Sequence, residues 1–383
     1  MGNLRVLVFS ATFGAGHLRA AEAVTEAIRI KEPQAEIIHL DFGEVISKTF
    51  NTVIKTTYIE LIKHTPKLWG KFYYRTSKIA PDSVLQRFLN GLGRQEFVKY
   101  INSYQPDLII CTYPTVSGVL AQLRMEKLLH VPVATVVTDY AVHSQWIHTG
   151  VDLYIVGCKD VYDGMVARGI NSNRIKITGI PVNPKFECIL DKQETRVKLG
   201  LDPKLPTFLV MGGAYGVLGG AKEICRFLSE KGAGVQSIVV CGRDAKLFQS
   251  LEGIVEKSQN RILLLGYVTN VEELMSAADL IITKAGGLTV SEALTKSLPL
   301  LIFRPIPGQE EENASFVDAI GAGKVSYTLE QLHADLLSVM NEPEELENMA
   351  SVAAGALPSR SAERAVEYML DLLHSDERAQ KIG

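Results

Sequence analysis

The regular alternation of short apolar runs with amphipathic stretches is the strongest constraint on the fold of this 383-residue sequence. Each run has the length and the unbroken hydrophobic character of a buried parallel strand. One series of runs lies at residues 4–10, 35–40, 108–112, 133–138 and 153–156. A second series lies at residues 207–211, 236–241, 262–265, 280–283 and 300–303. Helical patterns fall between the runs, so the sequence predicts doubly wound α/β sheets.

The two series are separated by residues 180–205, a proline-containing stretch without a strand pattern, which we interpret as an interdomain linker. A chain of this length also exceeds what one hydrophobic core usually holds. We therefore expect one Rossmann-like domain at 1–185, a second at 186–358, and a terminal helix with a tail at 359–383. We expect this C-terminal helix to pack back on the N-terminal domain. Ligands of such folds bind at the carboxyl ends of the strands, so we expect the two domains to face a shared cleft.

The composition excludes several classes of protein. Hydrophobic residues make up 46% of the chain and charged residues 22%, which is typical of a globular protein. The formal net charge of −3 argues against a chain that binds polyanions over its whole surface. The sequence has no run of 18 apolar residues and no signal-peptide pattern. The five cysteines form no CxxC pair, so we expect reduced thiols and a cytoplasmic location.

A glycine-containing loop follows the first predicted strand. Gly14 and Gly16 permit a tight turn and leave backbone amides at a helix N-terminus, where anions or polar ligands bind. Arg19 occupies the place of the third glycine of a dinucleotide-binding fingerprint, which argues against NAD. A tight turn without any ligand remains the alternative at this point.

His17 stands at the start of the helix that follows this loop and is the candidate general base. An imidazole titrates near neutral pH and can accept a proton from a hydroxyl group. The helix N-terminus should lower its pKa and keep the ring neutral. The alternative is a histidine that caps the helix or packs on the loop.

Two further glycine-rich loops lie in the second half of the chain. The first, at 212–220, follows the opening strand of the later series. In the second, the amides of Gly286 and Gly287 and the hydroxyl of Thr289 could bind a diphosphate at a helix N-terminus. Glu292, one helical turn later, could accept the hydroxyls of a ribose. These groups suit a nucleotide ligand.

A polar cluster follows the next predicted strand. Gln309 and Glu310 are suited to the hydroxyls of a sugar, whereas Glu311 and Glu312 are explained as acids in an ordinary first helical turn. The chain has no DxD motif and no histidine–acid cluster with the spacing of metal ligands, so we expect no metal and no other cofactor.

Seven short motifs occur in an order that resembles a known family. They are SATFGAGH from residue 10, TDYAVHSQW from 138, GIPV from 179, CGR from 241, GYV from 266, KAGGLTVSEAL from 284 and PGQE from 307. Over almost its full length the chain resembles the monogalactosyldiacylglycerol synthases and processive diacylglycerol glucosyltransferases. The resemblance implies a GT-B fold, a UDP-glucose or UDP-galactose donor, a diacylglycerol acceptor and inverting transfer of the hexose.

The resemblance also implies roles for individual residues. His17 becomes the general base, with Asp139 either orienting it or acting in its place, and His143 is expected to shape the acceptor site together with Trp146. The expected donor site consists of Gly16, Gly213, Arg243, Val268, Lys284, Gly286, Gly287, Leu288, Thr289, Glu292, Gln309 and Glu310. Asp244 departs from the asparagine expected after CGR, which affects only that side chain's contact.

Residues 51–100 form a basic and aromatic stretch with nine basic and three acidic residues, a local net charge of +6. Such a composition suits a surface of anionic lipid headgroups, with Lys67, Trp69, Lys71 and Arg75 as the candidate contacts. Nucleic acids attract similar patches, and a basic helical face on an ordinary domain is a further alternative. The site chemistry favours lipid, so we expect a peripheral protein on the inner face of the cell membrane.

Three other functions remain open from the sequence. A GlcNAc transferase of peptidoglycan-precursor synthesis would share the fold, but the first loop reads FGAGHLRAA rather than a GGTGGH-type sequence. A UDP-GlcNAc 2-epimerase would need no lipid patch and would convert the UDP-sugar alone. A nucleotide-sugar sensor would bind the UDP-sugar without releasing UDP to a lipid.

Overall fold

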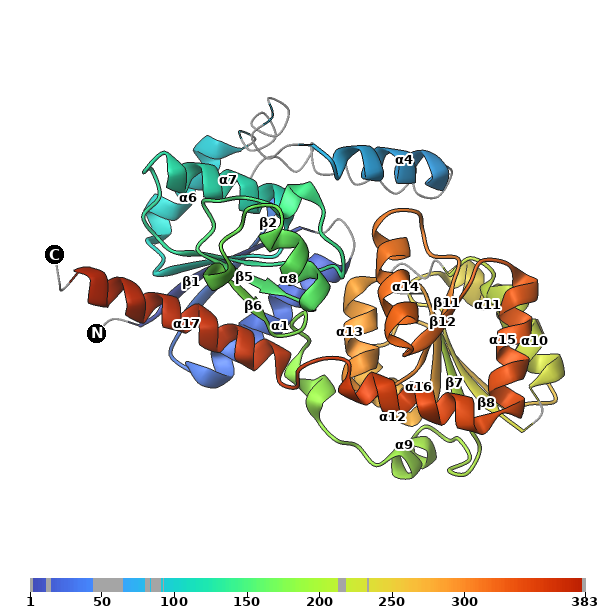
Figure 1. The fold of residues 1–383 in the computed structure, drawn as a ribbon. Coiled ribbons are helices and arrows are strands. Elements are labelled where there is room, and N and C mark those ends of the chain that lie inside the picture. The colour runs from blue at the N-terminus through green and yellow to red at the C-terminus, as the bar shows by residue number, and fades with distance from the viewer. Residues whose placement is uncertain are drawn as a thin grey trace. The chain divides into compact units, whose positions relative to one another are not determined.

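The fold is described from a computed structural model that covers residues 3–11, 15–43, 65–79, 83, 91, 93–212, 218–232 and 234–380 (Figure 1). The chain forms two compact units, each built on its own sheet. The first unit comprises Met1–Pro184, Ile306–Gln309 and Pro358–Gly383. The second unit comprises Lys185–Pro305 and Glu310–Leu357.

The first unit contains a six-stranded, entirely parallel sheet in the order β2-β1-β3-β4-β5-β6. Its strands are β1 (Arg5–Ser10), β2 (Glu36–Asp41), β3 (Leu108–Cys111), β4 (Val133–Val136), β5 (Leu153–Val156) and β6 (Ile175–Ile177). Its helices are α1 (Ala15–Lys31), α4 (Pro66–Thr76), α6 (Arg94–Tyr104), α7 (Pro114–Met125), η1 (Ser144–Trp146), α8 (Lys159–Val166) and η2 (Ser172–Arg174), with α17 (Ser361–Gln380) from the end of the chain. Because all six strands run in one direction, their carboxyl ends share one edge.

The terminal helix α17 packs against α1 and β5 of the first unit, as Figure 1 shows. Lys31 Nζ donates a 3.0 Å hydrogen bond to Glu367, and Ser361 Oγ accepts one of 3.2 Å from the amide of Val182. The expectation that the C-terminal helix packs back on the N-terminal domain is confirmed.

The segment Ile306–Gln309 joins the first unit because it packs on α4. A side chain at Gly70 would place its Cβ 2.5 Å from Cβ of Pro307. Gly308 has a φ of +100°, and a Cβ there would lie 2.8 Å from Cγ of Tyr73. The close approach of this turn to α4 therefore depends on both glycines.

The second unit is built on another six-stranded parallel sheet, in the order β12-β11-β10-β7-β8-β9. Its strands are β7 (Thr207–Met211), β8 (Gln236–Val240), β9 (Ile262–Leu265), β10 (Leu280–Thr283), β11 (Leu300–Phe303) and β12 (Gly323–Ser326). The helices after the short η3 (Pro184–Glu187) are α9 (Lys192–Lys198), α10 (Ala221–Lys231), α11 (Ala245–Val255), α12 (Val271–Ala277), α13 (Gly287–Thr295), α14 (Gln309–Ile320), α15 (Leu329–Asn341) and α16 (Pro343–Gly355).

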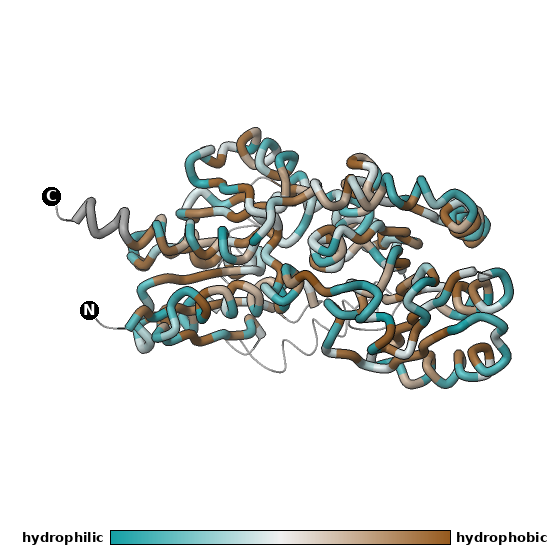
Figure 2. The backbone as a smooth tube through the Cα atoms, turned by 90° about the horizontal axis from the view of Figure 1, so that it is seen from below, coloured by the Kyte–Doolittle hydropathy of each residue, from teal (hydrophilic) through white to brown (hydrophobic). Residues whose placement is uncertain are grey.

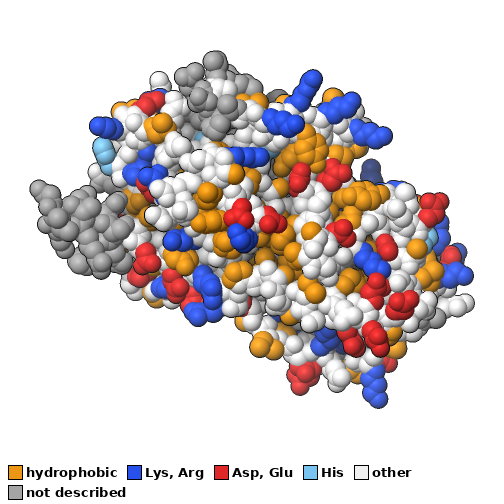
Figure 3. Space-filling model, in the orientation of Figure 1, with side chains coloured by type: hydrophobic (Ala, Val, Ile, Leu, Met, Phe, Trp, Pro, Cys, Tyr) orange, Lys and Arg blue, Asp and Glu red, His pale blue; other side chains and the backbone are white. Residues whose placement is uncertain are grey.

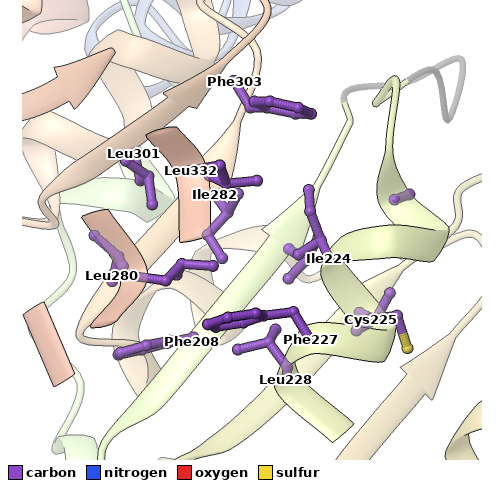
Figure 4. Close-up of a cluster of buried hydrophobic side chains, with 14 of the residues drawn as sticks. Phe208, Ile224, Cys225, Phe227, Leu228, Leu280, Ile282, Leu301, Phe303 and Leu332 are labelled. Carbon is purple, nitrogen blue, oxygen red and sulfur yellow. The ribbon is translucent and has the colours of Figure 1, made fainter. Parts of the chain in front are cut away.

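Each sheet is covered by amphipathic helices that bury their apolar faces. In Figure 2 the helices alternate between hydrophobic and hydrophilic residues along their turns. Figure 4 shows side chains of the second unit's core that come from the strands β7, β10 and β11 and the helices α10 and α15, among them Phe208 of β7, Ile224 and Phe227 of α10, and Leu332 of α15. Burial of these large apolar groups is the main favourable term in the stability of such a unit. Among the described residues, no helix combines the length and the apolar content needed to cross a bilayer.

All ten expected strands are present, with boundaries shifted by two residues at most. The prediction was incomplete at β6 and β12, which each form an edge of a sheet. β6 has only three residues, and β12 reads GKVS, so neither presents the run of apolar residues by which a buried strand is recognised. The first helix begins at Ala15 rather than near His17 or Ala20.

The stretch expected to be an interdomain linker is largely part of the second unit. Within it, Arg196 of α9 is only 5% exposed and donates to the carbonyl oxygens of Ala277 (2.9 Å) and Pro203 (3.1 Å). The same guanidinium makes a 2.5 Å ion pair with Asp279, which also accepts a hydrogen bond from the amide of Thr207. Arg196 therefore fastens α9 to the start of two strands.

We predict that Arg196→Met lowers the free energy of unfolding by about 3 kcal/mol, because it leaves two carbonyl oxygens without their donor and removes one of the partners of Asp279. Lys198→Met is the matched control, since Lys198 pairs with Glu273 on the surface and is 66% exposed. That change should cost less than about 1 kcal/mol. Urea denaturation of the full chain measures both, and equal losses in the two variants would contradict the prediction.

Candidate functional site

His17 lies in the first turn of α1 and is held at two points by threonines. Thr112 Oγ1 donates a 2.8 Å hydrogen bond to the backbone carbonyl oxygen of His17. Thr138 Oγ1 lies 3.0 Å from Nδ1 of the imidazole ring. The two threonines follow β3 and β4, which are neighbours in the sheet, so their side chains reach the same place. The backbone and the ring of His17 are thereby both fixed.

The imidazole of His17 lies among aromatic rings. Its centroid is 5.2 Å from that of Tyr113 in an edge-on arrangement and 6.2 Å from that of Trp146, which is 2% exposed. Burial lowers the pKa of His17 to about 4, and a backbone hydrogen bond at Thr112 acts in the opposite direction. The ring is therefore neutral at pH 7, as expected, but the main cause is loss of hydration rather than the helix N-terminus. Gly16 precedes it within the same helical turn.

Asp139 is buried, with 7% of its surface exposed, in the loop after β4. It accepts a hydrogen bond from the side-chain amide of Gln309. The sequence analysis expected these two residues in the same site, Asp139 beside the base and Gln309 beside the sugar. The structure brings them into direct contact within the first unit.

His143 connects the loop after β4 with helix α4. Its Nδ1 accepts a 3.2 Å hydrogen bond from the amide of Gln145, which leaves Nε2 to donate to the carbonyl oxygen of Tyr73 at 3.3 Å. The Tyr73 ring lies 4.7 Å from the imidazole, and the hydroxyl of Thr76 lies 3.2 Å from Nε2. Burial lowers the pKa of His143, which keeps this arrangement neutral. The neighbouring Ser144 donates to the Thr76 carbonyl oxygen at 2.7 Å.

Helix α4 presents an exposed surface that is both basic and apolar. Leu68 and Phe72 are 57% and 54% exposed, and the exposed basic residues Lys67, Lys71 and Arg75 flank them. We refer to these five residues as the α4 patch. In Figure 3, lysine and arginine side chains gather over the position that α4 has in Figure 1.

Two details of the predicted lipid-facing stretch differ from the sequence analysis. Trp69 is only partly exposed, with its ring 5.8 Å from that of Phe72, and Leu68, which was not predicted, is the more exposed side chain. Lys55, Tyr58, Lys63, Arg87 and Phe88 of the same stretch lie outside the described residues.

The start of α13 in the second unit presents a row of backbone donors. Gly286 is the N-cap and supplies no side chain, and α13 begins at Gly287, so the amides of Gly287, Leu288 and Thr289 have no partner within the helix. A Cβ on Gly286 would lie 3.9 Å from the hydroxyl of Thr289, which shows how close that hydroxyl is to the same end. Such a helix N-terminus binds anionic groups.

A buried asparagine holds this turn in place. Asn313 of α14 is completely buried and donates a 3.0 Å hydrogen bond to the carbonyl oxygen of Ala285. Beside the turn, Lys284 Nζ forms a 3.2 Å ion pair with Glu310, and both side chains are largely buried. Glu292 lies one turn into α13 and is half-buried. The structure therefore places the Lys284–Glu310 ion pair beside the N-terminus of α13, with Glu292 one turn further along the helix.

The remaining predicted donor residues follow β8 and β9 at the same edge of the sheet. The Arg243 guanidinium lies 4.8 Å from the centre of the Tyr267 ring, and Val268 next to it is half-buried. Asp244 accepts a 2.9 Å hydrogen bond from the amide of Leu247 and is the N-cap of α11. An asparagine caps a helix equally well, which explains why the departure is tolerated.

Gly213 lies outside the described residues. Among the residues that the structure describes, no group of three or more histidine, cysteine or acidic side chains is arranged to hold a metal ion.

Comparison with known proteins identifies the family. The profile of the monogalactosyldiacylglycerol (MGDG) synthases matches residues 17–182, and that of the glycosyltransferase family 28 C-terminal domain matches residues 207–365. The processive diacylglycerol beta-glucosyltransferase of Staphylococcus epidermidis is 30% identical over 383 residues, all of this chain and 96% of that protein. The enzyme of the same name from Staphylococcus haemolyticus is 32% identical over 99% of this chain and 96% of that protein. The chain belongs to the family of diacylglycerol glycosyltransferases.

Solved structures support the fold of this glycosyltransferase. MurG of Acinetobacter baumannii superposes with a TM-score of 0.64 at 16% identity, covering 97% of this chain and all of that one. UDP-GlcNAc 2-epimerase of Neisseria meningitidis gives a TM-score of 0.59 at 14% identity, with 97% and 100% covered. At such low identity these similarities establish the fold alone. The two Rossmann-like sheets form a GT-B fold, as expected.

Sequence reasoning missed Thr112 and Thr138 as residues of the candidate site of this glycosyltransferase. Both were visible as polar residues at the ends of predicted buried strands, the position where α/β folds place ligand-binding groups. Thr138 was noted only as part of the motif that contains Asp139. No pattern in the sequence showed that these threonines reach His17, because that contact depends on the order of the strands.

The low pKa of His17 predicts how stability depends on pH. The unfolded chain has the ordinary histidine pKa of 6.5, so between pH 6.5 and about 4 it binds more protons at this position than the folded chain does. The free energy of unfolding should therefore decrease as the pH falls through this interval. His148, whose pKa burial also lowers to about 4, contributes in the same direction.

In His17→Gln this decrease should be smaller than in the wild type, because one of the histidines whose pKa is lowered by burial is absent. His130→Gln, at an exposed histidine, should follow the wild-type curve. Urea denaturation at pH 7 and at pH 5 measures the difference. A wild-type decrease no larger than that of His17→Gln would contradict the low pKa.

Proposed function

We propose that this glycosyltransferase moves glucose from UDP-glucose to diacylglycerol at the surface of an anionic membrane, with inversion at the sugar carbon and without a metal ion. The observation that carries the proposal is the imidazole of His17 at the edge of the first sheet, held at its backbone and its ring by two threonines. A neutral imidazole can take the proton of the acceptor hydroxyl, which makes that oxygen a nucleophile for C1 of the sugar.

The second unit supplies groups suited to the donor. In the proposed complex the free amides of Gly287, Leu288 and Thr289 bind the diphosphate, whose negative charge grows as the bond to the sugar breaks. Arg243 and Lys284 add positive charge, and Glu292 accepts hydroxyls of the ribose. Gln309 and Glu310 bind hydroxyls of the glucose. With these donors in place, stabilisation of the leaving UDP does not need a metal ion.

The names of the relatives support glucose and diacylglycerol as substrates. The Staphylococcus proteins are called processive diacylglycerol beta-glucosyltransferases, and the sugar of UDP-glucose has the α configuration, so a β product requires inversion. The description of the matching N-terminal family favours galactose as the second candidate. Transfer of GlcNAc and 2-epimerisation find support only in folds shared at 16% identity or less.

The proposal is tested with purified full-length protein, diacylglycerol in vesicles and one of UDP-glucose, UDP-galactose or UDP-GlcNAc, each with and without a chelator. We expect glucosyldiacylglycerol from UDP-glucose at the same rate in both conditions. If a glycolipid forms only with UDP-galactose, the donor is UDP-galactose rather than UDP-glucose. If the UDP-sugar is epimerised and no lipid product forms, the protein is an epimerase rather than a transferase. If the chelator abolishes activity, the reaction needs a metal ion.

His17→Ala should lower the rate of transfer by roughly 10²–10⁴-fold, the usual contribution of a general base, while the affinity for UDP stays unchanged. His130→Ala is the matched control, because His130 is an exposed histidine of the same unit. Transfer is followed by analysis of lipid products and UDP affinity by calorimetry. An active His17→Ala variant would remove His17 as the base.

The α4 patch supports the membrane part of the proposal. Each basic residue near an anionic surface contributes about 1 kcal/mol, so replacing Lys67, Lys71 and Arg75 by Gln should weaken binding to anionic vesicles by roughly a hundredfold. The control replaces the exposed lysines 222, 231 and 257 of the second unit, which removes the same charge. Vesicle flotation distinguishes the two variants, and equal binding by both would contradict a role for α4.

A further inference from the structure

The hydrogen bond between Thr138 and His17 has a role in the reaction as well as in the fold. We propose that Thr138 is a positioning residue that holds the His17 ring with Nε2 directed to the acceptor hydroxyl. This inference rests on the proposed function, in which His17 accepts the acceptor's proton. It concerns the orientation of the His17 imidazole relative to the acceptor hydroxyl.

The geometry limits which ring nitrogen can act. Nδ1 lies 3.0 Å from Thr138 Oγ1 and is therefore occupied. A proton from the acceptor must be received at the other nitrogen, Nε2. In a neutral imidazole only one nitrogen carries hydrogen, so a lone pair on Nε2 requires the proton to be on Nδ1. In the proposed reaction Nδ1–H donates to the Thr138 hydroxyl oxygen, and this hydrogen bond holds the orientation of the ring.

The balance of protons is simple. Nε2 takes the proton of the acceptor hydroxyl as that oxygen bonds to C1 of the sugar and the bond from C1 to the UDP oxygen breaks. The imidazolium that results keeps its Nδ1–H on Thr138, and it later loses the Nε2 proton to solvent. The threonine hydroxyl accepts a hydrogen bond throughout and never changes its own protonation.

The surroundings of Thr138 show that the contact is built rather than incidental. Thr138 is 2% exposed and follows β4 at the sheet edge where Thr112 follows β3. Thr112 Oγ1 holds the backbone carbonyl oxygen of His17 at 2.8 Å. The Thr138 hydroxyl lies 3.0 Å from Nδ1 and restrains the ring itself. Neither threonine can be exchanged for the other, because one holds the carbonyl oxygen and the other the ring.

Thr135 of β4, three residues before Thr138 in the chain, provides a matched control. It is completely buried, and its hydroxyl bonds that of Ser117 at 2.8 Å, away from His17. Thr135→Val and Thr138→Val each remove one buried hydroxyl and keep the shape of the side chain. They should cost similar stability, but only the second should slow the reaction.

The experiment measures kcat and both KM values for the wild type, Thr138→Val, Thr138→Ser and Thr135→Val in the full chain with UDP-glucose and diacylglycerol vesicles. We expect kcat to fall roughly tenfold to a hundredfold in Thr138→Val, a part of the 10²–10⁴-fold typical of a general base, with both KM values unchanged. Thr138→Ser should recover most of the rate, because it restores the hydroxyl. Thr135→Val should keep the wild-type kcat.

Wild-type kcat in Thr138→Val would overturn the inference. So would an equally slow Thr138→Ser, since packing of the methyl group would then be the cause, or an equally slow Thr135→Val. If Thr138→Val does not fold, Thr138→Ser and Thr138→Ala replace it, and the inference requires the serine variant to be the faster. Failure of the proposed function itself looks different, because then the wild type transfers no hexose or His17→Ala remains active.

Discussion

Parallel pairing of the strands is the constraint on which the candidate site depends. In each unit all six strands run in the same direction, so the residues that leave their carboxyl ends meet at one edge although they are far apart in the sequence. His17, Thr112 and Thr138 come together in this way from three strand ends of the first unit. In the second unit the start of α13 follows β10 and the loop with Arg243 follows β8, two strands that end at the same edge of the sheet. The strand order alone is therefore enough to bring these polar residues to one edge of the sheet.

Burial of His17 determines its protonation state, just as strand pairing determines its position. An imidazole in water would be partly protonated near pH 6.5, and a protonated ring cannot act as a base. Burial of His17 beside Tyr113 and Trp146 disfavours the charged form and lowers the pKa of the ring to about 4. The threonine hydroxyls then orient it without adding a charge. Stability and function are linked here, because the burial that keeps His17 unprotonated also makes the folded protein less stable at acid pH, where His17 would be protonated in the unfolded chain.

The sequence predicted more of the fold than of the contacts. Strands with unbroken apolar runs were recognised, whereas the short edges β6 and β12 carry too few apolar residues to be distinguished from loops. His17 and Asp139 were identified through their motifs, but the hydrogen bond of Asp139 to Gln309 joins positions 170 residues apart and could not be read from spacing. The cause of the low pKa of His17 was also misjudged, because burial by Tyr113 and Trp146 is a tertiary property.

The central claim is that His17 is neutral in the folded protein at physiological pH. The most direct measurement is a titration of the full chain with ¹⁵N-labelled histidine, followed by NMR of the ring nitrogens and assigned by comparison with His17→Gln. The account predicts that the His17 signals remain those of a neutral ring down to about pH 5. A midpoint at or above the ordinary value of 6.5 would contradict it.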